Sequence, residues 1–561
     1  MISKIKIEDK TDEQKIEELH DFYDAYYNQE VKIRFNKLKV LRLLRQLGYI
    51  WYVPETTDEA KKGMIIHIKN NRIRIKDIAN AQTGMKMYIR SLPERKKEFA
   101  RKTIGEDGKP DVTKYIYTIT PEFLEAKFLD NLSNLFGGDL MYHLRVDEEE
   151  GLLKMQEDTV DEKYIYFNNK VLRVTKNGTE EISYDDLTGY VWENNILNRD
   201  FEYTEQVGDF EKFIGDICGY DPTNANKQQL MTGKQRKRSL MSILGYLMHN
   251  NYECDRKALV FTDVNDIDAD ESNGRTGKGI LGKALCQMIN RRKSDCRYLV
   301  VPGKGFEFKD TRYSAGDIST QLIHIEDANA NTFDFELFFC DVTDGCLFRK
   351  LHQNPTIHDC KMMISVNHTI DVMNSESKMG RVCIFELTNY YRSDYTPEMK
   401  YGRRFFESKW TNDDWMQFYS FMVRCCETYM KYGLIKPDMV NYANRLLEES
   451  LPEDFRFFLE YQINPYLKHK DRFEINKNEF YGKLVEKYHD FARYSQKKIS
   501  TMCIRYFKLR QIPSAQVRTT RDGTYIDLFV LHPNAADNVY KWIYRKSDKQ
   551  EDMQQDMNFE E

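Results

Sequence analysis

The sequence lacks several features that mark particular classes of protein. Its 11 cysteines include no Cys-x-x-Cys pair, so neither a disulfide framework nor a zinc ribbon is indicated. No apolar run approaches the roughly 18 residues that a membrane-spanning helix needs. The first residues are charged throughout and contain no apolar segment of the kind found in signal peptides. These absences predict a protein of a reducing cytoplasm, bacterial or of a host cell, with no membrane partner.

Two catalytic patterns are missing as well. The 11 histidines include no His-x-His pair of the kind a rolling-circle nickase needs, and no acidic pair between residues 113 and 235 predicts a primase centre. The composition, 41% hydrophobic and 31% charged over 561 residues, is that of a soluble globular protein with three or four domains. A formal net charge of −5 excludes a uniformly basic binding domain but permits a local basic stripe or channel.

The strongest pattern opens with an apolar strand at Lys257–Thr262 and a polar loop that leads into a helical repeat from Ile280. A strand, a glycine-containing loop, a lysine and a helix together predict a phosphate cradle, in which Lys278 reaches the β- and γ-oxygens. The residues expected to bind the nucleotide are Gly274, Thr276, Gly277, Lys278 and Gly279. An ordinary strand–loop–helix turn is the alternative for this stretch taken alone.

The cradle departs from the usual pattern at two positions. Glycine is expected at 272 and serine or threonine at 279, but the chain has Ser272 and Gly279 there. No hydroxyl therefore follows Lys278 to bind Mg²⁺.

Polar residues end or begin three further apolar runs. Glu326 and Asp327 follow one run, where one acid can lie near Mg²⁺ and the other can orient the attacking water. Asn367 ends the next run and can contact the γ-phosphate or the water. Arg381 precedes the last run and suits an arginine finger that stabilises charge in a neighbouring subunit's site. Taken singly, these residues are more often a solvated strand end, a turn residue and a surface arginine.

The order and spacing of these four elements, from Lys257 to Tyr391, resemble the superfamily 3 helicases of viruses, phages and plasmids, within the AAA+ class. They look most like the poxvirus- and phage-type primase-helicase branch. The resemblance implies an AAA+ P-loop core that uses ATP and Mg²⁺, with Asp327 as a metal ligand. It also implies catalytic roles for Glu326, Asp327, Asn367 and Arg381.

A second part of the resemblance concerns DNA. The run from Phe338 to His352 resembles the family's extra motif and the start of its DNA-gripping β-hairpin, which implies that Arg349, Lys350 and His352 contact DNA. A competing assignment puts Lys350 at the nucleotide and the hairpin tip nearer His358 and Lys361.

The N-terminal flank carries helical and hairpin patterns. We expect a helix from Asp12 to Tyr27, a second helix from Asn36 that stops at Gly48, and a hairpin over residues 63–76 around an Asn-Asn pair. The hairpin could meet phosphates or be a solvated face. A basic stretch follows, and Gly105–Pro110 is expected to be a linker.

The C-terminal flank predicts a long helix capped at Thr411, and two helices with a hairpin between residues 476 and 532. That pattern favours a winged-helix-like domain whose second helix and wing enter a DNA groove, or contact a protein instead.

The whole pattern predicts an α/β AAA+ P-loop ATPase core with a mostly helical N-terminal region and a C-terminal winged-helix-like domain. The expected parts are an N-terminal helical and winged module (1–112), an adaptor and oligomerisation region (113–235), the ATPase domain (236–395), a C-terminal helical and winged-helix domain (396–546) and a disordered acidic tail (547–561).

We therefore expect an ATP-dependent DNA helicase for the replication of a phage, virus or mobile element. It would form a ring of identical subunits, a hexamer by resemblance, on single-stranded or forked DNA, with room for a separate primase or polymerase. The alternative is a nucleotide-switched assembly, packaging or defence ATPase without unwinding activity.

Overall fold

The computed structural model describes residues 12–53, 63–104, 110–145, 153–254, 256–264, 276–289, 296–303, 312–317, 319–328, 338–349, 355–367, 380–469, 472–521 and 524–531. The chain forms two compact units, which alternate along the sequence between residues 159 and 201. The first comprises Met1–Asp158, Tyr164–Arg173 and Glu180–Phe201, and the second comprises the remainder. Within the described ranges, no helix combines the length and apolar character needed to span a membrane.

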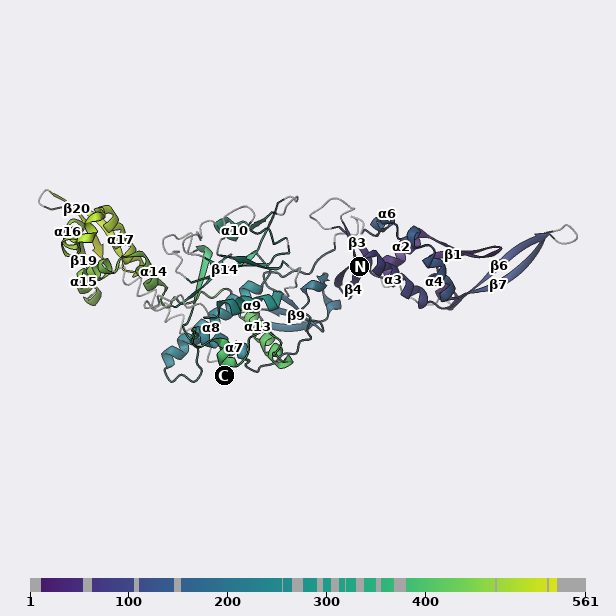
Figure 1. The fold of residues 1–561 in the computed structure, drawn as a ribbon, viewed down its shortest axis with the longest axis horizontal. Coiled ribbons are helices and arrows are strands. Elements are labelled where there is room, and N and C mark those ends of the chain that lie inside the picture. Colours follow the sequence, from purple (N-terminus) through teal and green to yellow (C-terminus); the bar gives the residue numbers. More distant parts are fainter. Residues whose placement is uncertain are drawn as a thin grey trace. The chain divides into compact units, whose positions relative to one another are not determined.

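The first unit mixes helices and strands (Figure 1). Its elements are α1 (Asp12–Leu19), β1 (Tyr23–Asn28), β2 (Glu30–Phe35), α2 (Lys37–Gln46), β3 (Tyr49–Tyr52), β4 (Met64–Lys69), β5 (Arg72–Lys76), α3 (Ile78–Arg90), β6 (Arg95–Ile104), β7 (Pro110–Ile119), α4 (Pro121–Leu129), α5 (Leu132–Leu135), α6 (Gly138–Met141) and β11 (Val191–Trp192). Strands β11, β5, β4 and β3 form one sheet in that order. The prediction of a mostly helical N-terminal region is therefore wrong.

The helix predicted over Asp12–Tyr27 ends at Leu19, and β1 follows it. Within β1 buried residues alternate with more exposed ones, and Tyr23 and Ala25 are directed into the core. That period of two fits a strand, and β1 pairs with β2 along its whole length. The predicted helix is therefore correct only for Asp12–Leu19, the first half of the segment.

Two other N-terminal predictions are confirmed. Asn36 caps α2 through its side chain, and Gly48 beyond the helix has φ +87°, the left-handed conformation that glycine adopts at helix ends. Strands β4 and β5 form the predicted hairpin, with Lys69 opposite Arg72. Asn70 and Asn71 between them both have positive φ, as a two-residue turn of this type requires.

The residues on both sides of the expected linker form a hairpin, whereas residues 105–109 of that linker lie outside the described residues. Strands β6 and β7 pair antiparallel over ten residues each, from Arg95 opposite Ile119 to Ile104 opposite Pro110, and the hairpin extends away from the helices of its unit (Figure 1). The predicted boundary at 112/113 falls inside β7, and the one at 235/236 falls inside helix α8. The rest of the five-part division stays a prediction, and its tail, 547–561, lies outside the described residues.

The second unit contains a parallel sheet, a helical layer and a smaller C-terminal module. Its elements are α7 (Asp209–Cys218), α8 (Lys227–Met248), β12 (Ala258–Asp263), α9 (Lys278–Ile289), β13 (Tyr298–Pro302), β14 (Leu322–Ala328), α10 (Phe339–Thr343), β15 (Cys346–Phe348), β16 (Thr356–His358), β17 (Lys361–Val366), β18 (Val382–Leu387), α12 (Pro397–Tyr401), α13 (Asn412–Tyr432), α14 (Tyr442–Ser450), α15 (Glu453–His469), β19 (Phe473–Asn476), α16 (Lys477–Lys487), α17 (Gln496–Leu509), β20 (Ser514–Arg521) and β21 (Thr524–Leu531). Strands β8 (Lys163–Tyr166), β9 (Val171–Thr175) and β10 (Gly178–Ile182) form a separate three-stranded sheet where the two units alternate along the chain.

The central sheet has five parallel strands in the order β13-β14-β17-β12-β18. Every residue of β12, β17 and β18 is buried, as expected of a sheet covered on both faces. Numbered along the chain, the strand order is 2-3-4-1-5, so the first strand lies between the fourth and the fifth. The sequence predicted four of these strands and missed β13. The fold is thus confirmed as α/β with a parallel sheet.

The C-terminal module begins with α15 and runs helix, strand, helix, helix, strand, strand. Its three strands form an antiparallel sheet in the order β19-β21-β20. Asn476 caps α16 through its side chain, α17 is the second predicted helix, and β20 and β21 pair on either side of the turn predicted at residues 521–523. Thr411 likewise caps α13, in a reciprocal arrangement with Asp414.

Candidate functional site

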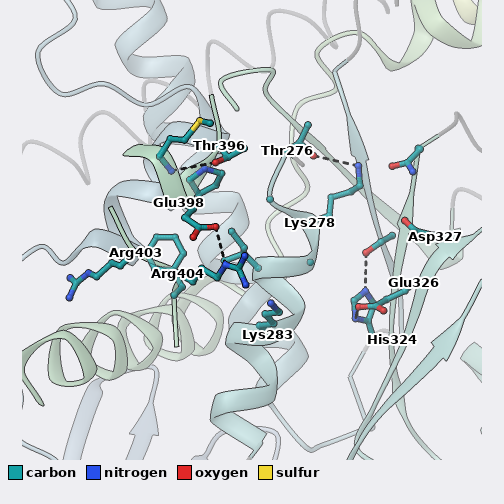
Figure 2. A pocket seen from close by; sticks show the side chains of 18 of the residues that line it. Thr276, Lys278, Lys283, His324, Glu326, Asp327, Thr396, Glu398, Arg403 and Arg404 are labelled. Carbon is teal, nitrogen blue, oxygen red and sulfur yellow. Dashed lines mark hydrogen bonds and ion pairs between the residues drawn. The ribbon is translucent and has the colours of Figure 1, made fainter. Parts of the chain in front are cut away.

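A cavity of about 1100 Å³ opens at the carboxyl ends of the sheet strands (Figure 2). In a parallel sheet this edge, beside the point where the strand order reverses, is where ligands bind. The cavity is lined on one side by residues 276–280, Glu326, Asp327 and Asn367, and on the other by residues of the segment Thr396–Phe405. Lys278, both acids and Asn367 therefore meet at one site, although they lie up to 89 residues apart in the sequence.

Helix α9 begins at Lys278, directly after a glycine with φ +112°. A Cβ atom at Gly277 would lie 2.6 Å from the ring of Phe213 in α7, so only glycine fits both the conformation and the space. Helix α7 thus supports the loop from behind. The predicted Gly274 lies outside the described residues.

Lys278 is buried, and its ammonium group donates a hydrogen bond to Asp263, the buried last residue of β12. The Thr276 hydroxyl donates to the other oxygen of the same carboxylate at 2.5 Å. Burial lowers the pKa of Lys278, and the negative charge of Asp263 opposes that shift. Binding of phosphate would therefore exchange one anionic partner of Lys278 for another. Asp263 was not predicted as a site residue, although an acid at the end of the strand before the loop was a visible signal.

Glu326 and Asp327 are both exposed at the end of β14. Asp327 has φ +51°, an uncommon conformation for a residue other than glycine, and the pairing of β14 with β17 shifts register between Ile325 and Ala328. This irregularity lets two consecutive residues, which would point to opposite faces of a regular strand, both line the cavity.

A buried histidine lies beneath the acids. His324 of β14 makes hydrogen bonds to the Tyr298 hydroxyl of β13 at 2.8 Å and to the Ser365 hydroxyl of β17 at 2.9 Å. Burial lowers the pKa of His324 to about 4, so the ring is neutral at neutral pH. Its 3.8 Å contact with Glu326 is then not an ion pair. His324 therefore joins three strands below the site and adds no positive charge to it.

Asn367 is exposed directly after β17 and lines the cavity as predicted. Arg381 does not. It precedes β18, at the opposite edge of the sheet, and six residues of strand, roughly 20 Å, separate it from the edge where the cavity opens. Within one subunit Arg381 and Lys278 are thus at opposite ends of the sheet.

The far side of the cavity was not predicted. Thr396 caps the short helix α12, and Glu398 at its start receives a hydrogen bond from Arg404 at 2.9 Å. Both side chains are exposed, and Figure 2 shows the pair across the cavity from Lys278 and Asp327. Arg403 is held elsewhere, in ion pairs with Asp414 at 2.6 Å and Asp209 at 2.8 Å. Of the two arginines in this segment, Arg404 is therefore the one whose charge faces the cavity. Its ion pair with Glu398 lies on the surface and can be exchanged for another partner.

The segment is anchored by Asp216 of α7. Its carboxylate accepts hydrogen bonds from the Lys400 ammonium at 2.7 Å, from the Tyr401 hydroxyl at 2.9 Å and from the Tyr391 hydroxyl. Lys400 and Tyr401 belong to α12, so Asp216 sets where this helix stands over the cavity. The pairing raises the pKa of Lys400 against the opposing effect of burial.

No protein-family model matches this chain, and no curated protein matches it. Its function is therefore inferred from the geometry of the cavity.

The predicted DNA hairpin is described in part. Strands β15 and β16 pair antiparallel, with Cys346 opposite His358, and Arg349 is exposed just beyond β15. Lys350 and His352 lie outside the described residues. The competing placement of the hairpin tip near His358 and Lys361 is wrong, because His358 pairs with Cys346 at the end of the hairpin away from the turn. Lys361 is 3% exposed, and its ammonium group lies 4.0 Å from the centre of the Tyr246 ring. The other part of that assignment, Lys350 at the nucleotide, lies outside the described residues.

Proposed function

We propose that this protein is an ATP-dependent, ring-forming DNA helicase that serves replication of a phage, virus or mobile element. One observation carries the proposal. A parallel sheet of order 2-3-4-1-5 brings a loop lysine, an acidic pair and an asparagine to one cavity, from the first, third and fourth strands. Those residue types, so arranged, suit the binding and hydrolysis of a nucleoside triphosphate.

The residues at the cavity fit a nucleotide with Mg²⁺. The described residues contain no cluster of three or more histidine, cysteine or acidic side chains that could hold a metal ion. Mg²⁺ bound with a nucleotide needs only one or two carboxylates, because substrate phosphates and water complete its shell. Asp327 and Glu326 supply carboxylates that reach the cavity. When bound, the ion neutralises charge on the phosphates.

The chain's own groups then have separate tasks. Lys278 leaves Asp263 to contact the β- and γ-phosphates, and the backbone N–H groups at the start of α9 face the same anion. Whichever acid does not bind the metal orients the attacking water, and the Asn367 amide contacts the γ-phosphate or that water. Arg404 can exchange Glu398 for a phosphate oxygen.

The position of Arg381 supports assembly into a ring. Because Arg381 lies at the opposite edge of the sheet from its own cavity, an arginine finger at this position would act in the site of another subunit. A head-to-tail ring, hexameric by the resemblance above, presents this edge to the next cavity. The hairpin of β15 and β16, with Arg349, Lys350 and His352, is proposed to contact single-stranded DNA through its phosphates.

The test is strand displacement on a forked DNA duplex with ATP and Mg²⁺. Lys278→Ala should abolish both hydrolysis and unwinding, because the phosphates lose their buried positive partner. Lys234→Ala, an exposed lysine on α8, is the matched control and should retain both activities. Normal hydrolysis by Lys278→Ala would show that the site is wrongly assigned.

One observation favours a second function. Gly279 leaves the loop without the hydroxyl that usually binds Mg²⁺. A slow ATPase that switches assembly, packaging or defence would tolerate that loss. Hydrolysis by the wild type without any strand displacement would support this alternative.

A further inference from the structure

The C-terminal module, α15 to β21, has the element order of a winged helix, in which the third helix carries the exposed recognition face. Here that helix is α17. One face of α17 is buried and contributes Ile499, Cys503 and Phe507 to the core. The Phe507 ring contacts the Phe529 ring of β21 at 5.6 Å, which fixes the helix to the wing strands.

The other face of α17 is basic. Lys497, Thr501, Ile504 and Lys508 are exposed at spacings of four, three and four residues, which places them on one side of the helix. The helix contains no Asp or Glu. Among the described residues, neither Lys497 nor Lys508 makes an ion pair. Within the described part of the chain, no acidic side chain therefore neutralises their charges.

The charge of the module differs from that of the whole chain. Between Glu453 and Leu531 there are 15 Lys and Arg residues and 10 Asp and Glu residues, whereas the complete chain has a net charge of −5. A positive module in an acidic protein indicates a local anionic partner rather than general solubility.

The wing adds a cation and an aromatic ring. The Arg518 guanidinium on β20 lies 4.9 Å from the centre of the Tyr525 ring on β21, and Tyr525 is 67% exposed. Asp527 offsets part of this charge, at 3.7 Å from Arg518. Arg510, at the end of α17, bonds instead to Asn444 of α14 at 2.8 Å and so has a structural role.

We propose that this module binds duplex DNA, with α17 in the major groove and the β20–β21 wing against the adjacent backbone. Lys497 and Lys508 are eleven residues apart, about 16 Å along a helix. That separation spans a groove about 12 Å wide, so that both ammonium groups reach phosphates at its edges. Thr501 and Ile504 between them face the base edges. DNA is favoured over an acidic protein because duplex phosphates present dense, regular charge along a groove that accepts a helix.

This site is independent of the nucleotide cavity. Duplex DNA would bind without ATP, and Lys278→Ala should bind it as the wild type does. The module would hold the parental duplex while the motor acts on a single strand. If this proposal is wrong, duplex binding is affected, whereas if the helicase proposal is wrong, strand displacement is affected.

The experiment measures fluorescence anisotropy of the full-length protein with a labelled, blunt-ended duplex of about 20 base pairs, without nucleotide, at several salt concentrations. Lys497→Gln combined with Lys508→Gln should weaken binding about ten-fold or more near 0.1 M salt. Because each phosphate contact contributes about 0.9 to the slope of log K against log salt, the slope should become shallower by about 1.8.

The matched control carries Lys468→Gln and Lys487→Gln. These lysines are exposed in the same module but on the α15 side, where the Lys487 ammonium lies 5.8 Å from the centre of the Tyr461 ring. The control should bind like the wild type. Equal losses in both double variants would show that only net charge matters and would overturn the assignment to α17. Absence of duplex binding by the wild type would also overturn it and leave a protein partner for this face.

Discussion

Acid should weaken the parallel sheet specifically through His324. The ring is buried between β13, β14 and β17, and burial lowers its pKa from 6.5 to about 4. Between these two values the unfolded chain binds a proton that the folded chain excludes. Stability therefore falls as pH drops through this window, whereas above about 6.5 the histidine contributes no pH dependence.

The size of the effect follows from the two pKa values. Linkage gives a loss of about 2 kcal/mol in the free energy of unfolding between pH 7 and pH 5. The full loss, once both states are protonated, is about 3 kcal/mol. Such a change is a large fraction of the stability of an ordinary domain.

Hydrogen exchange measured by mass spectrometry can follow this loss locally, in peptides from β13, β14 and β17, after correction for the intrinsic pH dependence of amide exchange. His324→Asn keeps a polar side chain that does not titrate. It should be less stable than the wild type at pH 7 but lose little more by pH 5. Equal losses of protection in the two proteins over this range would refute the role assigned to His324.

Three further predictions concern the cavity. Arg381→Ala should bind ATP but not hydrolyse it. Mixing this variant with Lys278→Ala should restore part of the ATPase activity, because a mixed ring contains some sites with both residues intact. No recovery on mixing would contradict a finger that acts between subunits. Asp216→Asn should raise the KM for ATP about ten-fold, or about 1.4 kcal/mol, because α12 loses its charged anchor. The change in kcat should be smaller. An unchanged KM would show that α12 does not contact the nucleotide. Gly279→Ser should lower the Mg²⁺ concentration needed for half-maximal hydrolysis, since a Cβ there meets no atom within 4 Å and the hydroxyl can bind the ion; an unchanged Mg²⁺ dependence would show that the ion lies elsewhere.

Much of the core sheet could be predicted because its strands are short apolar runs that end in polar residues. Glu326, Asp327 and Asn367 each follow such a run, and parallel strands bring their carboxyl ends to one edge. Strand β13 was missed because Tyr298–Pro302 is five residues long and no polar side chain at its end signals a site.

The far side of the cavity could not be predicted for a different reason. Glu398 and Arg404 belong to a polar segment without periodicity, and the tertiary contacts of Asp216 place that segment across the cavity from the start of α9. Asp263 was overlooked because it was assigned to the loop, whereas it is the last residue of β12. In the N-terminal region, a helix and a strand with adjacent apolar residues were merged into one helix, since the change of period at Tyr23 covers only a few residues.

The contacts of Asp263 also join the loop before α9 to helix α14, which adjoins the C-terminal module. Its backbone oxygen accepts a hydrogen bond from Arg445 of α14, which also donates to the Thr262 hydroxyl at 3.2 Å. Helix α14 in turn holds the end of α17 through Asn444 and Arg510. In the proposed function Lys278 leaves the Asp263 carboxylate for a phosphate, and the Thr276 hydroxyl remains as a hydrogen-bond donor to that carboxylate. Asp263 thus contacts the proposed phosphate-binding lysine through its carboxylate and helix α14 through its backbone oxygen, so the buried end of β12 is held whether or not Lys278 moves.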